Sequence, residues 1–365
     1  MLNAAIVGCG WVSDWHVSDG LAHLPKSYRL LACCDTNSNR LDAFAARYGT
    51  PRKVADFSAV VAMSDIDVVI ICTPPSLHHE MVRAALRAGK HVICEKPFAA
   101  SLAEVDDIIS EEARSRGRCM PIFNYRFGDG IARVRHIIQS GVAGRHYISS
   151  AETAKRRGPD YYAVDWRGKF ATELGGVLLT QAIHTHDLLL WLIGPVVELA
   201  CFKTTRVNPI EVEDCAVASL RMADGSLASI TATLGSVRQV TRLRLCFENV
   251  TFERTAYDED SARPANEPWT ILPKNAEVAR VIEAKYAEVE PQHAWFVRQY
   301  ELFAEAIASG GPFPVALADA RASIELITAM FESDENRSVV RLPIDANHPK
   351  YHGWIRTTLQ KSGDG

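Results

Sequence analysis

The chain has 365 residues, of which 47% are hydrophobic and 23% are charged, and its formal net charge is −4. This length and composition are typical of a globular protein with about two domains, each long enough to bury its own core. The densest basic stretch, Lys155-Arg156-Arg157, is only three residues long. The charge pattern therefore argues against a nucleic acid or an acidic membrane surface as a partner.

The first residues and the cysteines indicate a compartment. Residues 4–7 form an apolar run with no charged segment before it, which argues against a secretory signal. No window approaches the roughly 20 apolar residues of a transmembrane helix. The nine cysteines include no CxxC pair, and Cys72 and Cys94 lie inside apolar runs, as buried reduced thiols do. We expect a cytoplasmic protein.

The first 120 residues alternate short apolar runs with longer amphipathic stretches. The predicted strands are residues 4–7, 30–34, 66–72 and 91–94, and the predicted helices are residues 15–24, 40–48, 77–88 and 102–115. Strands without polar alternation indicate a sheet that is covered on both faces. The alternation of strands and helices predicts a Rossmann-type domain, a doubly wound parallel sheet, over residues 1–122.

The pattern changes near Pro121, and residues 123–365 are predicted to form a second α/β domain. Strands 215–221 and 226–234 flank an Asp-Gly pair, which is a strong hairpin signal, and strands 241–247 and 250–255 form a second pair. These hairpins predict an antiparallel sheet. The remaining predicted elements are helices 178–192, 295–309 and 316–331, a closing strand at 339–342 and a surface excursion over 256–273.

A glycine pattern follows the first strand. Gly8 and Gly10 would let the backbone turn tightly and approach a pyrophosphate at the start of the next helix, beside Trp11 and Val12. Ser13 stands where the fingerprint has its third glycine. By itself this short glycine pattern is weak evidence for a dinucleotide site. Its position between a predicted strand and a predicted helix strengthens that evidence.

An acidic residue ends the second strand. Asp35 is placed to accept hydrogen bonds from the ribose hydroxyls and to repel a 2′-phosphate, which favours NAD. Arg40 keeps NADP open, although an arginine there is also an ordinary solvated charge. The structural alternative for Asp35 is an N-cap of the next helix, beside Thr36.

Polar residues and prolines follow the third strand. Thr73-Pro74-Pro75 lies at the carboxyl edge of the sheet, where open α/β sheets bind their ligands. His78 begins the next helix, and either a structural position or a place in the cofactor site fits it. We expect this segment to line the cofactor.

Glu95-Lys96-Pro97 follows the fourth strand at the same edge. A hydride can leave a carbinol carbon only if the hydroxyl proton also leaves, and Lys96 is placed to act as the base. Free lysine has a pKa of roughly 10.4, so burial or a nearby cation must lower it. In the reduction direction, protonated Lys96 would polarise the carbonyl. Pro97 suits a cis bond. By spacing alone, a surface lysine is the alternative.

A second polar cluster lies within residues 175–187. A single helix over residues 178–192 would place four side chains on one face, namely Thr180, His184, Asp187 and Trp191. His184 could then relay a proton with Lys96. We expect a hydrogen-bonded structural role for His186, and no metal site, because positions i and i+2 of a helix diverge.

These motifs resemble the Gfo/Idh/MocA oxidoreductases. The specific segments are AALRAGKHVICEKP at 84–97, with TPPSLH before it, and GGVLLTQAIHTHDLLLWLIG at 175–194; Asp319-Ala320-Arg321 and VVRLP at 339–343 add weaker support. The resemblance implies a Rossmann domain plus a C-terminal α/β domain with a large open antiparallel sheet. It also implies a homodimer or homotetramer formed through that sheet.

The resemblance also implies site residues. The family's catalytic lysine and histidine correspond to Lys96 and His184, Arg126 approaches the active site, and the Trp166-Arg167 pair lies on a loop that closes over the cofactor. Many polyol-oxidising members have aspartate where this chain has Thr180, so the proton route here would differ. The other candidate residues for the substrate pocket are Gln181, Tyr161 and Tyr162.

The sequence thus predicts hydride transfer between NAD(P) and a secondary alcohol or ketone of a sugar, cyclitol or sugar derivative. Lys96 would be the acid or base and His184 the proton relay. Two alternatives stay open. One is a redox-cycling enzyme that cleaves glycosides with retained NAD, and the other is a catalytically silent nucleotide-binding regulator.

Overall fold

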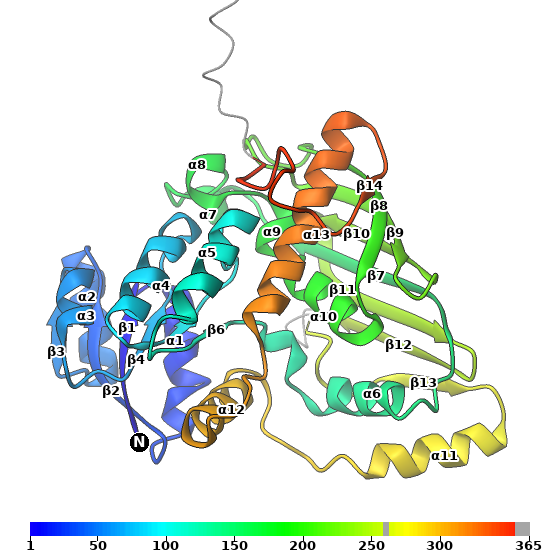
Figure 1. The fold of residues 1–365 in the computed structure, drawn as a ribbon, viewed down its shortest axis with the longest axis horizontal. Helices are drawn as coiled ribbons and strands as arrows, with labels where there is room; N and C mark the ends of the chain where they lie inside the picture. The colour runs from blue at the N-terminus through cyan, green and yellow to red at the C-terminus, as the bar shows by residue number, and fades with distance from the viewer. Residues whose placement is uncertain (258–262, 355–365) are drawn as a thin grey trace, which may run out of the picture.

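The computed structural model describes residues 1–257 and 263–354. These residues form two sheets, each with its own helices, and the chain passes from the first to the second near residue 121 (Figure 1). This arrangement confirms the predicted Rossmann domain and second α/β domain. The division at residue 122 itself stays a prediction, because α12 (Trp295–Ser309) returns to pack against the first domain.

The first sheet has six parallel strands in the order β3-β2-β1-β4-β5-β6. Their bounds are β1 Leu2–Val7, β2 Tyr28–Cys34, β3 Arg52–Val54, β4 Val68–Ile71, β5 His91–Cys94 and β6 Cys119–Pro121. The four central strands consist almost entirely of buried apolar residues, as predicted for a doubly covered sheet. The edge strands β3 and β6 are three residues long, too short to show a periodicity.

Side-chain caps fix several helix starts around this sheet. The helices are α1 Trp11–Ser18, α2 Ser38–Tyr48, α3 Phe57–Ala62, α4 His78–Arg87 and α5 Leu102–Glu112, with 3-10 turns η1 Leu21–His23 and η2 Pro75–Leu77. Asn37 and Ser101 accept hydrogen bonds from the third backbone amide of the helices that they precede. The first helix was expected to run from 15 to 24; it instead begins directly after Gly10 and ends at Ser18.

The second sheet has eight strands in the order β13-β12-β11-β7-β10-β9-β8-β14. Their bounds are β7 His146–Arg156, β8 Val196–Thr204, β9 Cys215–Met222, β10 Leu227–Thr233, β11 Gly235–Phe247, β12 Val250–Tyr257, β13 Thr270–Pro273 and β14 Val340–Arg341. Both predicted hairpins are present. The sheet is mixed rather than fully antiparallel, because β7, which the sequence did not reveal, pairs in parallel with β10.

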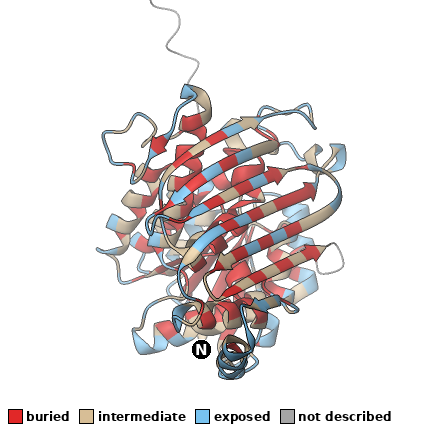
Figure 2. Cartoon of the chain, turned by 90° about the vertical axis from the view of Figure 1, so that its right-hand side faces the viewer, coloured by how far each residue is buried: buried red, intermediate tan, exposed pale blue. Residues whose placement is uncertain are grey.

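One face of this sheet is covered and the other is open. The remaining helices are α6 Asp129–Gln139, α7 Pro159–Tyr162, α8 Phe170–Glu173, α9 Val177–Thr180, α10 Ile183–Ile193, α11 Ala276–Ala287 and α13 Leu317–Asn336, with η3 Asn124–Arg126. Helix α13 packs against β8, α10 and α5 and so joins the two domains. Along the strands of the open face, buried and exposed residues alternate (Figure 2).

The predicted surface excursion over 256–273 is wrong for the part that the structure describes. Ala265 and Trp269 are buried, and they fill the space above two glycines at the start of α6. A Cβ on Gly130 would lie 2.6 Å from Cδ1 of Trp269, and a Cβ on Gly128 would lie 2.6 Å from the Ala265 carbonyl oxygen. This segment therefore packs as part of the second domain; residues 258–262 lie outside the described part.

No single helix in the described residues is both long enough and apolar enough to span a membrane. Phe170–Thr180 and Ile183–Ile193 meet those criteria only as a bent pair.

Candidate active site

The glycine turn after β1 is shaped by close backbone contact. Gly8 has φ +90°, and a Cβ there would lie 2.7 Å from the carbonyl oxygen of Cys72, at the end of β4. Only glycine fits this conformation and spacing. Gly10 precedes α1 with no side-chain cap, so the amides of the first turn remain available to an anion. Trp11 is more than half exposed beside them, and Val12 is half-buried.

Asp35 connects the glycine turn to the end of β2. Its Oδ2 accepts a hydrogen bond from the backbone N–H of Cys9 at 2.9 Å, and its Oδ1 accepts one from Asn37 at 2.7 Å. Asn37, not Asp35, is the N-cap of α2, so the structural alternative for Asp35 is wrong. Arg40 Nη2 lies 3.4 Å from Asp35 Oδ1, and Thr36 is exposed next to this pair.

The buried side chain of His78 connects the segment after β4 with the segment after β5. It is fully buried, with Nδ1 2.8 Å from the carbonyl oxygen of Pro97 and Nε2 2.9 Å from that of Thr73. Burial lowers its pKa. This position corrects the expectation that His78 lines the cofactor, because both ring nitrogens are engaged below the surface. The exposed part of this segment consists of Thr73 and Pro74, since Pro75 is buried.

Lys96 follows β5 and reaches across to the second domain. Its Nζ donates a hydrogen bond to the backbone carbonyl of Thr180 at 2.6 Å, and the bond to Pro97 is cis. Burial lowers the pKa of Lys96 to about 8, opposed by Glu95 and assisted by the charges of Arg167 and Arg157. The lysine is thus not a surface charge, and its protonation changes close to neutral pH.

The predicted helix 178–192 is broken, and the break creates the lysine's partner. Helix α9 ends at Thr180 and α10 begins at Ile183, with a bend of 49° between the flanking segments. The carbonyl groups in the last turn of a helix lack intrahelical partners, so that of Thr180 is free to accept from Lys96. The Thr180 hydroxyl donates to the Gly176 carbonyl at 2.8 Å. Thr180 therefore does not share the face of α10 that carries His184, Asp187 and Trp191, and that part of the expectation is wrong.

Glu213, which the sequence did not reveal, fixes the start of α9. Its carboxylate accepts hydrogen bonds from the backbone amides of Gly176 and Leu178 at 3.0 and 3.1 Å. A Cβ on Gly176 would lie 1.7 Å from the Glu213 carbonyl oxygen, which explains why position 176 is a glycine. Burial raises the pKa of Glu213 to about 7. This carboxylate holds α9, and with it the carbonyl that Lys96 binds.

His184 lies in the first turn of α10, stacked on Tyr125. The ring centroids are 4.6 Å apart with a 19° angle between planes, and His184 Nδ1 is buried without a partner among the described residues. Burial lowers the pKa of His184 well below its usual value, and the charges of Lys96, Lys155 and Arg263 lower it further. His184 is therefore neutral at physiological pH, and its Nδ1 is available for a hydrogen bond with a ligand.

A buried polar chain lies behind Lys96. Tyr300 on α12 contacts His16 Nδ1 at 2.6 Å, and His16 Nε2 contacts Glu95 at 2.9 Å. Glu95 also accepts from the backbone N–H of Lys96 at 3.0 Å. Burial alone would raise the pKa of Glu95, but His16 and Lys96 outweigh it and lower that pKa. No local sequence pattern indicates this polar network, because Tyr300 lies 284 residues from His16.

An aromatic and cationic wall lines the other side. Tyr161 lies between two guanidinium groups, with Arg167 3.9 Å and Arg157 5.1 Å from its ring centroid. Gln181 accepts from Arg157 at 2.9 Å and donates to the Tyr161 hydroxyl at 3.2 Å. Trp166 stacks under Arg167, and Tyr162 packs edge-on against Tyr161. The structure thus brings the predicted pocket residues together and adds Arg157.

Two residues differ from their expected roles. The guanidinium of Arg126 is buried, paired with both oxygens of Asp187, and 3.1 Å from Asp319. The expectation that Arg126 approaches the active site is therefore wrong. The charge of Arg126 is satisfied inside the domain. His186 is fully buried and neither ring nitrogen has a partner among the described residues, so the expected hydrogen-bonded role is wrong. Burial lowers its pKa to about 3.

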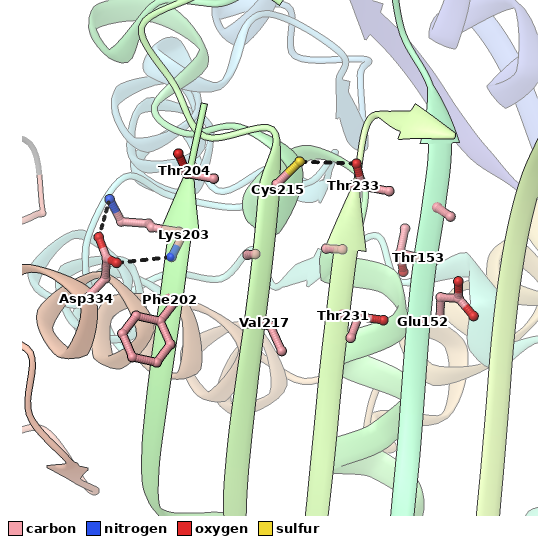
Figure 3. Close-up of a pocket in the computed structure, with 13 residues that line it drawn as sticks. Glu152, Thr153, Phe202, Lys203, Thr204, Cys215, Val217, Thr231, Thr233 and Asp334 are labelled. Carbon is pink, nitrogen blue, oxygen red and sulfur yellow. Dashed lines mark hydrogen bonds and ion pairs between the residues drawn. The ribbon is translucent and has the colours of Figure 1, made fainter. Parts of the chain in front are cut away.

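A hollow of about 460 Å³ lies elsewhere, at the second sheet. It is formed by β7, β8, β9 and β10 together with Asp334 of α13, and it contains none of the predicted site residues (Figure 3). Within the described ranges, no group of three His, Cys, Asp or Glu side chains is placed to hold a metal ion.

Comparison with known proteins identifies the family. Residues 2–123 match the family profile described as "Oxidoreductase family, NAD-binding Rossmann fold", and residues 131–253 match "GFO/IDH/MocA C-terminal domain". The chain belongs to this oxidoreductase family. The site geometry described above is thus that of a GFO/IDH/MocA protein whose N-terminal domain is an NAD-binding Rossmann fold.

Relatives of the protein act on several carbohydrates. It is 30% identical over 194 residues to D-glucoside 3-dehydrogenase of Escherichia coli, covering 53% of this chain and 54% of the relative. It is 33% identical over 202 residues to inositol 2-dehydrogenase of Salmonella typhimurium, covering 53% and 55%. The matched segments thus span about half the length of these relatives.

A solved structure matches over almost the whole chain. The WlbA dehydrogenase from Bordetella pertussis, in complex with NADH and UDP-GlcNAcA, has a TM-score of 0.82 and 25% identity. The match covers 94% of this chain and 99% of that one.

Proposed function

We propose that this protein is an NAD-dependent dehydrogenase that oxidises a secondary alcohol of a sugar, cyclitol or sugar derivative. The observation that carries the proposal is the placement of Lys96. It lies at the carboxyl edge of an NAD-binding sheet, with its amine held by the Thr180 carbonyl and its pKa lowered to about 8, near the neutral imidazole of His184. Such a pair suits removal of a hydroxyl proton near neutral pH.

The first domain fits a dinucleotide. The close approach of Gly8 to Cys72 and the uncapped start of α1 leave room and amide donors for a pyrophosphate beside Trp11 and Val12. Asp35 would accept from the ribose, and its pairing with Arg40 keeps some use of NADP open. Bound NAD⁺ would supply the hydride acceptor. Thr73, Pro74 and the Glu95–Lys96 backbone would line its nicotinamide end.

The chain's own residues then handle the proton. Unprotonated Lys96 takes the proton from the substrate hydroxyl, and the Thr180 carbonyl holds its amine in place. His184, whose Nδ1 is unpartnered among the described residues, is the proposed relay for that proton. Tyr161, Trp166, Arg167 and Gln181 would bind the sugar ring and shield it from water. The relatives' sugar and inositol substrates and the carbohydrate ligand of the WlbA dehydrogenase support this substrate class.

A cofactor-reduction screen tests the proposal. The purified protein is offered NAD⁺ or NADP⁺ with sugars, cyclitols and glycosides, and reduction is followed at 340 nm. We expect NAD⁺-dependent turnover of at least one polyhydroxylated ring. Glycoside cleavage with cofactor that never exchanges would favour redox cycling, and NAD binding without turnover across the panel would favour a silent regulator.

We further propose that the open face of the second sheet forms a homo-oligomer. Phe202, Val217, Thr231 and Glu152 form one row across four neighbouring strands (Figure 3). Phe202 is 68% and Val217 46% exposed. An exposed apolar patch on a sheet beside a hollow is typical of a protein interface. A homodimer or homotetramer would cover it.

Phe202→Asp is therefore expected to shift the protein toward monomers, because it places a charge in the apolar part of the row. Sedimentation velocity across a concentration series measures the shift. Val281→Asp, at an exposed valine of α11 away from the sheet, is the control and should not change the oligomeric state. Equal oligomerisation of both variants would contradict this interface.

A further inference from the structure

Positive charge gathers at the proposed site although the whole chain is acidic. The formal net charge is −4, yet four cationic side chains act on Lys96 and His184, namely Lys155, Arg157, Arg167 and Arg263. Two carboxylates also act on Lys96. Glu95 is buried and bonded to His16, and Glu173 is paired with Arg167 at 3.0 Å. The excess of cations is therefore local and is not balanced by these carboxylates.

Arg157 is one of these cations, and the hydrogen bonds of its guanidinium go to neutral oxygens. Its guanidinium donates to three neutral oxygens: the Arg156 carbonyl at 2.8 Å, Gln239 at 2.9 Å and Gln181 at 2.9 Å. Among the described residues, it forms no ion pair, and its Nε is buried without a hydrogen-bond partner. The positive charge of Arg157 is therefore not neutralised by a carboxylate among the described residues, which leaves it able to attract an anionic ligand.

The surrounding contacts fix the position of Arg157. Its backbone N–H donates to the Leu234 carbonyl at 3.0 Å, which ties the end of β7 to the end of β10. The Tyr161 ring lies on one side, and the Gln181 amide holds one Nη2 hydrogen. Arg157 is half-buried, and it also interacts with the Tyr161 hydroxyl. These contacts hold a planar guanidinium in place, the group that binds carboxylates and phosphates best.

The dinucleotide is not placed to neutralise the charge of Arg157. The phosphate-facing end of the first domain is the Gly8–Gly10 turn, and the ribose end is Asp35 with Arg40. Arg157 belongs to the second domain, and its contact with Gln181 places it next to the Thr180 carbonyl that holds Lys96. Arg263, in contrast, lies over the rings of Trp295 and Trp15. Arg157 therefore faces the substrate side.

We propose that the substrate carries an anionic group, a carboxylate or a phosphate, that pairs with the Arg157 guanidinium. This inference rests on the proposed function, because it assigns the substrate class of the same site. Thr180 is consistent with it, since its hydroxyl is bonded to the Gly176 carbonyl and the position offers no carboxylate that would repel an anion.

The test measures binding separately from turnover. NADH-loaded protein is titrated by calorimetry with the gluco, galacto and manno hexuronates, their neutral hexoses and uronamides, and the hexose 6-phosphates. NADH prevents oxidation, so the titration reports affinity alone. We expect at least one anionic sugar to bind about 10- to 100-fold more tightly than its neutral counterpart, as a charged hydrogen-bonded pair does. The uronate and phosphate arms distinguish the two sources of the anion.

Matched variants assign the effect to one residue. Arg157→Gln should remove the preference for the anion, and Arg157→Lys should retain only part of it, because lysine lacks the planar two-donor edge. Arg156→Gln removes the same charge at the neighbouring exposed position and should bind like the wild type. NADH affinity, measured by fluorescence, should be equal in all variants. Retained thermal unfolding midpoints show that each variant is folded.

The outcomes separate the two proposals. Equal affinity for anionic and neutral sugars, no binding of any anionic sugar, or equal effects of Arg157→Gln and Arg156→Gln would each overturn the anionic-substrate inference. NAD⁺ reduction by a neutral sugar would then still support the dehydrogenase. Selective anion binding through Arg157 without any NAD⁺ reduction would instead support the inference and count against the proposed activity.

Discussion

Replacing Lys96 with methionine is expected to lower kcat by about 10²- to 10⁴-fold, the range typical of losing a general acid or base. Methionine keeps most of the length and volume of the side chain but has neither the donor to the Thr180 carbonyl nor a titratable amine. NADH binding, measured by fluorescence titration, should persist, because the glycine turn is untouched. The measurement is steady-state NAD⁺ reduction with the substrate found in the screen.

The pH dependence gives an independent check on the same residue. Burial lowers the pKa of Lys96 to about 8, and oxidation requires the unprotonated amine. The oxidation rate should therefore rise as the pH increases through about 8, and the reduction rate should fall over the same range. Lys53→Met, which removes an exposed lysine paired with Asp42, is the control and should keep both the rate and the profile. Full turnover by Lys96→Met would exclude the proposed mechanism.

Arg126→Met is expected to destabilise the fold by about 3–5 kcal/mol, the usual result of removing one partner of a buried ion pair. Asp187 would remain in the interior without its bidentate partner. Burial already raises the pKa of Asp187 to about 6 against the opposing effect of Arg126, so losing the arginine would leave a costly carboxyl group. Equilibrium urea unfolding measures the change.

Two further variants interpret this result. Arg145→Met breaks an exposed pair with Glu248 and should cost about 0–1 kcal/mol. The double variant Arg126→Met/Asp187→Leu should recover much of the lost stability, because it removes both charges. If Arg126→Met kept wild-type stability and raised only the KM, the arginine would be a ligand contact, as the sequence resemblance implies, and the structural role would be excluded.

Local patterns were sufficient for much of the fold. Strand His91–Cys94 and helix Trp295–Ser309 have the predicted bounds, because an uninterrupted apolar run and a clear amphipathic repeat each report one element. The hairpin at Asp224-Gly225 forms as expected, with Gly225 at φ +87°. Strand β7 was missed because its polar residues hide the alternation, although it lies in the middle of the second sheet.

The sequence was sufficient to predict the reacting residues of the candidate site, but not the residues that hold them in position. Lys96 and His184 follow recognisable motifs, whereas Glu213 and His16 act through partners tens to hundreds of residues away, which no local pattern reveals. In the sequence, Arg157 is only the last residue of a basic triplet that is too short to indicate nucleic-acid binding. Its proposed role in binding an anion depends on three neutral hydrogen-bond partners, which only the folded structure shows.

The contact between Lys96 and the Thr180 carbonyl has an evolutionary consequence. Every residue type has this main-chain oxygen, and only proline would lose the backbone N–H that Thr180 donates to Gly176. Position 180 can therefore change its side chain without removing the acceptor that binds Lys96. The family can therefore alter what this position presents to a substrate while the proton-handling group stays in register. The side chain of residue 180 can thus vary while its main-chain oxygen continues to bind Lys96. Residue 180 is therefore a good first target for directed evolution toward new sugars.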